Sequence, residues 1–447
     1  MAENVTELNE AQMLDTQMIQ VLKDNDKNGK YTVPAEGLYP HQWLWDSAFI
    51  SIGIAHYDIA RAEKEILRLF KAQWKNGMIP HMILADKTGI KPELDAWRSS
   101  ISPLSPKKYA TSGITQPPVL AEAVVQIGRH LSKPERRSWY KRVYPGLIKY
   151  HQWLYEDRDP HKEGLVLNIH PWETGMDNTP PWMVEMNAHQ PVLWIRIVEK
   201  LRLDTVLQFM RSDKKYIMSG QRIATLDALR MYSAQRRLRR KQYDIDKILK
   251  HGLFAVEDVM FNSILIRNNK LLEEIAKTLN RKIPEPLTES FRKNEFALEQ
   301  LWDGESGMYF NRNFITHDHI KIPTIATLMP LYAGCLDKER TKQLIALLKT
   351  SRAFSPKYPI PTVPTTSKYF SPHGYWQGPT WINMNWMLID GLRRSGEKEM
   401  ADILKSKTIE LVEKAGPYEY FSPRDGSSAG AKNFSWTAAL TLDLLKN

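Results

Sequence analysis

The sequence predicts a mainly α-helical protein, built as a closed toroid of paired helices. Apolar residues recur at helical spacing through most of the chain, whereas the alternating runs typical of strands are few and short. Aromatic-rich segments interrupt the helical pattern at rough intervals, and each contains Gly or Pro, which ends a regular helix. About ten to twelve helices with such connections favour hairpins around a ring, where the loops at one end converge on one pocket.

The predicted helices follow from their apolar stripes and their caps. Asp58 is a candidate N-cap for a helix whose stripe is Ile59, Ala62, Ile66, Leu67 and Phe70. The same pattern predicts helices over 270–279, 341–349 and 400–414. The segment 435–446 is apolar on most sides, which predicts a buried final helix.

Strands are predicted only at 164–169 and 307–312, as small hairpins beside the helices. The interrupting aromatic segments are 39–46, 73–81, 112–118, 170–182, 374–381 and 417–423. No Gly/Ser-rich or low-complexity linker divides the chain, so we expect one domain over 1–447. Residues 205–225 are the predicted flexible excursion from it.

Composition narrows the class of protein. Of 447 residues, 42% are apolar and 25% charged, as in an ordinary globular protein. The acidic N-terminus lacks the apolar run of a secretory signal, and no window reaches the roughly eighteen apolar residues of a membrane span. Cys335 is the only cysteine, which excludes an internal disulfide and favours a reducing compartment. We therefore expect a cytoplasmic protein without a membrane partner.

The net charge of +11 would attract anions, but it does not predict a nucleic-acid partner. The densest basic run, QRRLRRKQ at 235–242, lies in a helical setting and is typical of a solvated face. No recognised nucleic-acid-binding module accompanies it.

Several familiar chemistries are not supported by the motifs. HDH at 317–319 is an incomplete metal site on a polar turn, and HExxH and CxxC are absent. GSSAG at 426–430 spells G-x-S-x-G, but no histidine follows it, since the last is His373; we expect a flexible loop there. Phosphate-cradling glycine loops are absent as well. The sequence therefore predicts no metal and no cofactor.

Carboxylates among aromatic residues are the remaining signal. HPWETGMDNTPPW (170–182) and PYEYFSPRDG (417–426) both have this composition. A glycosidase needs one carboxyl to protonate the departing oxygen and another to act at the anomeric carbon, and apolar surroundings help the first to keep its proton. Buried structural aromatics are the competing interpretation.

At this point the motifs resemble a known family. WLWDSAF, QWKNGMIPH, SGITQPP, WETGMDNTP, YWQGPTWINMNW and YEYFSPRDG, in order along the chain, resemble the glycoside hydrolase family 63 group of processing α-glucosidases and mannosylglycerate and glucosylglycerate hydrolases. Trehalases are more distant relatives. The resemblance implies an (α/α)6 toroid of the six-hairpin glycosidase type and inverting hydrolysis of an α-glycosidic bond.

The resemblance also implies catalytic roles. Asp177 in GMDN corresponds to the general acid, and Glu419 in YEYF to the general base. Inversion requires the two carboxyls to stand roughly 6.5–9.5 Å apart. Glu173 is the rival acid, because a helical turn would put it on one side with Asp177. With Asp177 as the acid, we expect Glu173 either to support other site residues from behind or to contact sugar. Asp46 looks like a carboxylate that grips sugar hydroxyls, with a helix cap as the alternative.

Other residues are predicted to contact substrate. The candidate aromatic walls are Trp45, Trp172, Trp376, Trp381 and Trp436, each of which could instead pack in the core. Gln116 and Asn178 suit hydrogen bonds to hydroxyls, and Tyr39 and Tyr375 would extend the site toward the leaving group.

We expect a small α-glucoside or α-mannoside as substrate, such as glucosylglycerate, mannosylglycerate or a short α-gluco-oligosaccharide. A glycerate carboxylate needs a binding group; the candidates are Arg211, Lys214, Lys215, Tyr216 and Arg222, which could equally be surface residues. The alternatives are a catalytically silent carbohydrate-binding toroid and a lyase or phosphorylase on a similar scaffold. The sequence leaves open the choice of glucose or mannose, the aglycone and any homo-oligomeric state.

Overall fold

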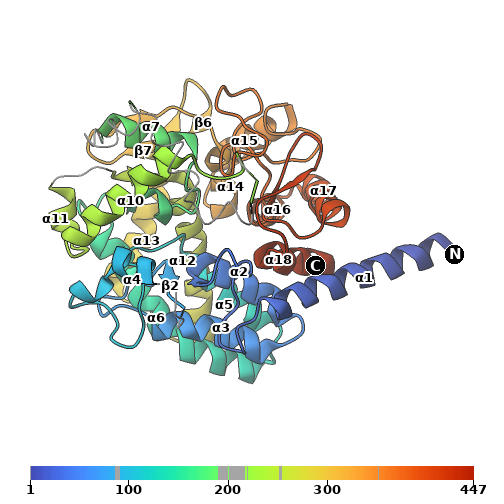
Figure 1. Ribbon diagram of the computed structural model, residues 1–447, viewed down its shortest axis with the longest axis horizontal. Coiled ribbons are helices and arrows are strands. Elements are labelled where there is room, and N and C mark those ends of the chain that lie inside the picture. The colour runs from blue at the N-terminus through green and yellow to red at the C-terminus, as the bar shows by residue number, and fades with distance from the viewer. Residues whose placement is uncertain are drawn as a thin grey trace.

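The computed structural model describes residues 2–85, 91–189, 200, 217–218, 220–250, 254–350 and 352–447. In these ranges the chain is mainly helical, and its strands are no longer than three residues. Helices are arranged as a ring within a ring (Figure 1).

The inner ring is a closed circuit of contacts. α2 contacts α5, which contacts α12; α12 contacts α14, α14 contacts α16, α16 contacts α18, and α18 returns to α2. These inner helices are α2 (Leu44–Ala55), α5 (Leu120–Arg129), α12 (Val259–Leu279), α14 (Pro330–Ala333), α16 (Ile382–Arg394) and α18 (Ser435–Lys446). Every residue of α2 is buried, as expected for a helix covered on all sides.

The outer helices cover the inner ring and alternate with it along the chain. They are α1 (Ala2–Asp24), α3 (Ile59–Lys71), α6 (Lys133–Asp157), α13 (Glu285–Ala297), α15 (Lys338–Thr350) and α17 (Lys398–Ala415). Among their contacts, α3 packs on α2 and α5, α6 on α5 and α12, and α17 on α16 and α18. α1 packs on α18 and extends away from the body toward the N-terminus (Figure 1). The predicted (α/α)6 toroid is confirmed.

The ring closes where its first and last inner helices meet, and this seam depends on a glycine. A Cβ atom added at Gly53 of α2 would lie 2.4 Å from the Cα atom of Ala439 in α18. The backbones of the two helices therefore approach each other too closely for a side chain at this position.

Short strands lie between the helices. β3 (Leu167–Asn168), β4 (Val256–Glu257), β7 (Asn311–Asn313) and β8 (His319–Ile320) form one antiparallel sheet in the order β3-β4-β7-β8. Three two-stranded antiparallel pairs complete the set in the described residues: β1 (Gln42–Trp43) with β2 (Met82–Ile83), which α2 and α3 separate in the chain, and the hairpins of β5 (Trp302–Asp303) with β6 (Met308–Tyr309) and β9 (Tyr420–Phe421) with β10 (Ser428–Ala429).

The strand predictions were therefore only partly right. The run 164–169 does not form a hairpin, because β3 pairs with β4, which follows α10 (Thr225–Arg240) and α11 (Ile245–Leu249) in the chain. The run 307–312 does contain a hairpin strand, β6, but it is broken at Phe310, whose N–H donates to Leu301, and β7 joins the larger sheet.

The helix predictions are confirmed. Asp58 caps α3, with its carboxylate accepting the Arg61 backbone N–H at 2.9 Å. The runs 270–279, 341–349 and 400–414 lie in α12, α15 and α17, and α18 spans 435–446. The basic run lies in α10 (Thr225–Arg240) and ends in the turn after it. The remaining helices are α4 (Lys91–Trp97), α7 (Pro180–His189), α11 (Ile245–Leu249), and the 3-10 turns η1 (Ser99–Ile101), η2 (Pro171–Glu173), η4 (Leu298–Leu301) and η5 (Ile325–Leu328).

Candidate active site

The predicted site residues gather where inner helices begin. Asp46 lies in the first turn of α2, Gln116 just before α5, Trp381 directly before α16, and Trp436 at the start of α18. These N-terminal ends meet at one end of the toroid, because Trp45 and Trp381 both pack on Trp436 and the Trp45 N–H donates to Gln116. The segments that carry Asp177 and Glu419 reach the same end, as their side-chain contacts show.

Glu419 is held by donors on both oxygens. It stands beside the β9–β10 hairpin and is 1% exposed. The Tyr39 hydroxyl donates to Oε1 at 2.8 Å, the Ala431 N–H donates to Oε2 at 2.9 Å, and Arg222 donates to Oε2 at 3.3 Å. These three donors stabilise a negatively charged carboxylate.

GSSAG has a structural role beside this carboxylate. The motif forms β10 and the turn around it, rather than the loop expected from the sequence. A Cβ atom at Gly430 would lie 2.6 Å from Oε2 of Glu419. The glycine therefore leaves the space that the carboxylate occupies.

Asp177 has a different environment. It is half-buried, and its Oδ2 accepts a hydrogen bond from the Tyr375 hydroxyl at 3.2 Å. Burial raises the pKa of Asp177 to about 7, although the hydrogen bond from Tyr375 and the charge of Arg222 oppose the rise. A carboxyl with this pKa keeps its proton up to neutral pH.

Asp46 is the third carboxyl of the cluster. It is not a helix cap, because α2 begins at Leu44 and its N-cap is Trp43. Burial, together with repulsion from Glu419 and Asp177, raises the pKa of Asp46 well above its usual range. The three carboxyls are thus close enough to influence one another electrostatically.

Four tryptophans pack beside these carboxyls. Trp376 and Trp381 stack with ring centroids 3.7 Å apart and planes 4° from parallel. Trp45 lies 5.8 Å from Trp376 and 5.1 Å from Trp436, centroid to centroid. Within the described part of the chain, the buried indole N–H groups of Trp376 and Trp436 have no hydrogen-bond partner. Such donors are suited to ligand hydroxyls.

Arg222 brings a cation into this cluster. Its guanidinium lies over the rings of Tyr39 and Tyr375, at 5.0 and 4.6 Å from their centroids, and donates to the Tyr39 hydroxyl as well as to Glu419. Sequence reasoning named Arg222 only as one of five candidates. The other four, Arg211, Lys214, Lys215 and Tyr216, lie outside the described residues, as do 205–216 and 219 of the predicted excursion.

Gln221 anchors the segment that carries Arg222 through two hydrogen bonds. Its backbone carbonyl accepts from the Tyr420 hydroxyl, and its side-chain Oε1 accepts the Gly430 N–H at 3.2 Å. Both partners border Glu419. The segment 220–222 is therefore docked directly onto the predicted base.

Two predicted hydrogen-bonding residues contact the protein backbone. Gln116 accepts the Trp45 N–H at 3.4 Å. Asn178 donates to the Gly374 carbonyl at 3.2 Å and accepts the Trp376 N–H at 2.9 Å. Asn178 was expected to bind sugar hydroxyls, but these contacts tie its amide to the loop around Tyr375.

Glu173 does not share one helical face with Asp177, so that argument was wrong. The turn η2 ends at Glu173, and residues 174–179 are irregular. The Glu173 carboxylate is fully buried in an ion pair with Arg158 at 2.8 Å and also accepts the Ile169 N–H at 2.8 Å. These contacts are typical of a structural ion pair.

Trp172 also packs apart from the four clustered tryptophans. Its ring lies 4.5 Å from His170, 5.8 Å from Trp97 and 5.3 Å from Tyr232, centroid to centroid. A sugar contact for Trp172 stays a prediction.

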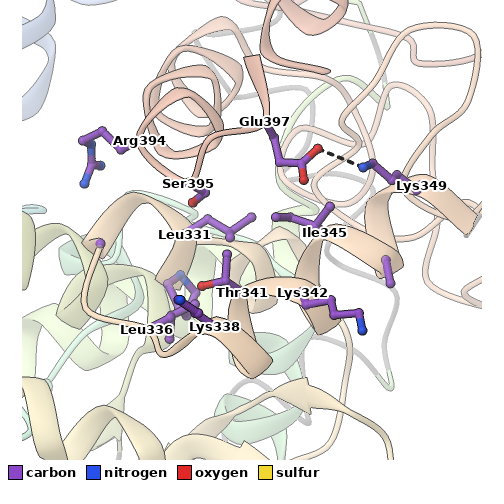
Figure 2. Close-up of a pocket in the computed structure, with 13 residues that line it drawn as sticks. Leu331, Leu336, Lys338, Thr341, Lys342, Ile345, Lys349, Arg394, Ser395 and Glu397 are labelled. Carbon is purple, nitrogen blue, oxygen red and sulfur yellow. Dashed lines mark hydrogen bonds and ion pairs between the residues drawn. The ribbon is translucent and has the colours of Figure 1, made fainter. Parts of the chain in front are cut away.

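A separate pocket of about 860 Å³ lies between the end of α14, α15 and the turn after α16 (Figure 2). Leu331 and Ile345 line it together with Lys338, Lys342 and a Lys349–Glu397 ion pair of 2.8 Å. No residue predicted for the site lines this pocket.

Metal and membrane features can be stated for the described ranges. In them, no group of three or more His, Cys, Asp or Glu is arranged to hold a metal ion. Across the same residues, no helix is long and apolar enough to cross a membrane. HDH at 317–319 lies at the start of β8, where His319 pairs with the Gln300 carbonyl at 2.8 Å.

Comparison with known proteins identifies relatives of the whole chain. Residues 39–437 match the family described as the mannosylglycerate hydrolase MGH1-like glycoside hydrolase domain. The mannosylglycerate hydrolase of Thermus thermophilus is 38% identical, over 95% of this chain and 98% of that protein. The glucosylglycerate hydrolase of Mycolicibacterium hassiacum is 32% identical, over 95% and 96%.

Solved structures share the fold. A family 63 mannosylglycerate hydrolase from a second strain of Thermus thermophilus, crystallised with Tris and D-glycerate, superposes with a TM-score of 0.85 at 36% identity and covers 96% of this chain and 99% of its own. The neutral trehalase Nth1 of Saccharomyces cerevisiae, at 18% identity and a TM-score of 0.58, shares the fold alone.

Proposed function

This chain belongs to the mannosylglycerate hydrolase MGH1-like family of glycoside hydrolases, and from that premise we propose that it hydrolyses an α-linked glycosyl-glycerate with inversion, using Asp177 as acid and Glu419 as base. The observation that carries this proposal is the contrast between the two carboxyls. One is set to hold a proton at neutral pH, and the other is surrounded by hydrogen-bond donors.

Asp177 would donate its proton to the glycosidic oxygen. Its raised pKa, about 7, supplies the proton, and the Tyr375 hydroxyl binds one carboxyl oxygen. The other oxygen would face the substrate. Protonation makes the departing glycerate oxygen a better leaving group.

Glu419 would deprotonate the attacking water. A general base must be able to accept a proton from the water molecule. The hydrogen bonds from Tyr39, Ala431 and Arg222 favour the carboxylate form of Glu419, which can do so. The water attacks the anomeric carbon from the face opposite the leaving group, which requires the two carboxyls to stand about 6.5–9.5 Å apart.

Arg222 would bind the glycerate carboxylate. A guanidinium recognises a carboxylate through paired N–H donors. Arg222 is the cation of the cluster within the described residues, and its buried Nε atom has no partner there. Binding would require the guanidinium to share or leave Glu419, which frees the base for a water molecule.

Asp46 and the unpartnered indole N–H groups of Trp376 and Trp436 would hold the sugar hydroxyls. An indole of this cluster would offer an apolar face for the C–H side of a pyranose ring. The two proposed substrates are mannosylglycerate and glucosylglycerate, since relatives named for each match almost the whole chain.

The remaining parts of the proposal concern the whole chain. We infer a single catalytic domain over 1–447, because the inner helices of the described residues, from α2 to α18, form one closed circuit of contacts. A cytoplasmic location suits the lone Cys335, whose thiol pKa is raised to about 11 by burial.

Paired variants test the roles. Asp177→Asn and Glu419→Gln are each expected to reduce kcat by about 10³-fold or more on mannosylglycerate or glucosylglycerate, because each removes one half of the acid–base pair. NMR during early turnover is expected to detect the β-anomer of the released sugar first. Circular dichroism tests whether both variants are folded. An early α-anomer, or wild-type kcat in either folded variant, contradicts the proposal.

A further inference from the structure

Tyr375 has a backbone conformation that an aromatic residue rarely adopts. Its φ is +65°, in the left-handed region, where the Cβ atom crowds the backbone. Such a conformation persists only when neighbouring contacts enforce it. Its side chain is also the one that donates to Asp177, so its backbone geometry controls where that hydroxyl lies.

Asn178 supplies contacts on both sides of this residue. Its Nδ2 donates to the carbonyl of Gly374, and its Oδ1 accepts the N–H of Trp376. The Asn178 backbone carbonyl accepts a third hydrogen bond, from the Gln377 side chain at 3.1 Å. One side chain therefore bridges the peptide groups that flank Tyr375.

The bridge and the acid are neighbours in sequence. Asp177 accepts a hydrogen bond from the Tyr375 hydroxyl, and Asn178 binds the backbone on both sides of Tyr375. The segment 177–178 therefore contacts both the side chain and the backbone of Tyr375. The Trp381 indole adds to it by donating to the Tyr375 carbonyl at 3.0 Å. Any movement of Tyr375 relative to Asp177 must break one of these hydrogen bonds.

We propose that Asn178 is a positioning residue for the reaction: it holds Tyr375 in its left-handed backbone so that the tyrosine hydroxyl orients the carboxyl of Asp177. This inference rests on the proposed function, in which Asp177 is the acid. A role as a sugar ligand is less well supported, because the side chain is 3% exposed and both ends of its amide are engaged.

The role has a signature in the pH profile. The hydrogen bond from Tyr375 lowers the pKa of Asp177 and so opposes the effect of burial. Loss of the bond is therefore expected to raise that pKa and move the alkaline limb of kcat/KM to higher pH. A merely structural residue would lower the amount of folded enzyme without moving this limb.

The first variant is Asn178→Ala. We expect kcat to fall roughly tenfold through misalignment of the acid, and the alkaline limb to move upward by about half a pH unit. Tyr375→Phe, which keeps the bridge and removes the hydroxyl, is expected to move the limb in the same direction. The double variant is expected to move it no further than Tyr375→Phe alone.

Asn262→Ala is the matched control. Asn262 is a fully buried asparagine of α12 whose amide makes two backbone hydrogen bonds to Val166, each 2.9 Å. Its loss is expected to lower Tm while the alkaline limb stays in place.

The outcomes separate this inference from the proposed function. Full activity of folded Asp177→Asn would end both. Two results with an inactive Asp177→Asn would contradict the inference alone. In the first, folded Asn178→Ala keeps the alkaline limb of the wild-type kcat/KM profile. In the second, the shifts of that limb in Asn178→Ala and Tyr375→Phe add fully in the double variant. Asn178→Ser replaces Asn178→Ala if the latter does not fold. If neither folds, Asn178 is a folding residue, and the positioning role is overturned.

Discussion

At the residue scale, Asp177 and Glu419 differ in what surrounds them rather than in their chemistry. Glu419 accepts three hydrogen bonds, one of them from a cation, whereas the side-chain donor to Asp177 is a neutral hydroxyl, that of Tyr375. Burial without compensating donors disfavours a negative charge. The same type of side chain can therefore act as acid in one position and as base in the other.

This difference predicts the pH dependence of the reaction. Burial raises the pKa of Asp177 from 3.8 to about 7, so the proton is held below neutral pH and lost above it. The acid works only while protonated. We expect kcat/KM to fall on the alkaline side, with a midpoint near pH 7, in steady-state assays from pH 4 to 9.

Folding must be followed alongside that profile. Circular dichroism across the same range separates loss of the proton from loss of structure. An alkaline midpoint near pH 4, as for an exposed aspartate, would show that burial does not raise the pKa of the acid.

Residue-level predictions from the sequence were limited by contacts across the chain. Asn178 looked like a sugar ligand because its partners, Gly374 and Trp376, come from a loop almost two hundred residues away. Glu173 looked like a neighbour of Asp177 because the end of η2 left no clear mark in the sequence. Its partner Arg158 shows why a carboxylate is tolerated there.

At the element scale, the segment 220–222 joins the site to a part of the chain with no catalytic motif. Gln221 binds Tyr420 and Gly430, and Arg222 lies between Tyr39 and Tyr375. A planar guanidinium suits this setting, since it can stack on rings and present several donors at once. Lysine has the same charge but lacks this shape.

Arg222→Lys tests the proposed carboxylate contact. We expect KM for a glycosyl-glycerate to rise roughly tenfold, because paired hydrogen bonds to the carboxylate are lost. The methyl ester of the same substrate, which has no negative charge there, is expected to respond much less. Initial rates on both substrates measure the difference.

Arg236→Lys, at an exposed position of α10, is the control and should leave both KM values unchanged. An equal rise in KM for the acid and its ester would contradict a contact to the carboxylate. The sequence could not single out Arg222 among its candidates, because only folding brings its segment to Tyr39 and Glu419.

At the scale of the whole molecule, the toroid depends on the contact between α2 and α18. Gly53→Ala is expected to lower the free energy of unfolding by a net amount of about 1–3 kcal/mol. The overpacking cost exceeds the roughly 1 kcal/mol by which alanine has the better helix propensity. The added Cβ would lie 2.4 Å from a backbone atom of Ala439, which cannot simply rotate away. Urea denaturation measures the change.

Gly304→Ala provides the comparison. A Cβ atom there would meet nothing closer than the Trp302 indole nitrogen at 3.9 Å. Its free energy of unfolding should stay within about 0.5 kcal/mol of wild type. Equal stability of the two variants would mean that the seam relaxes freely.

The helical class and the course of the ring could be predicted from local patterns. Asp58, the stripe that follows it and the apolar final helix all depend on neighbours in sequence. The strand order β3-β4-β7-β8 could not be predicted from the sequence, because strands of two or three residues show little alternation of apolar and polar residues. The silent carbohydrate-binding alternative is set aside, since the chain belongs to a glycoside hydrolase family.

The common starting end of the inner helices has an electrostatic consequence. Aligned peptide dipoles leave about half a positive charge at each helix N-terminus, so α2, α5, α16 and α18 together make the potential more positive at the end of the ring that carries the candidate site. Such a field accelerates diffusional encounter with an anion and is screened by dissolved salt. Capture of a glycerate-bearing sugar should therefore slow as ionic strength rises, whereas capture of an uncharged glycoside should not.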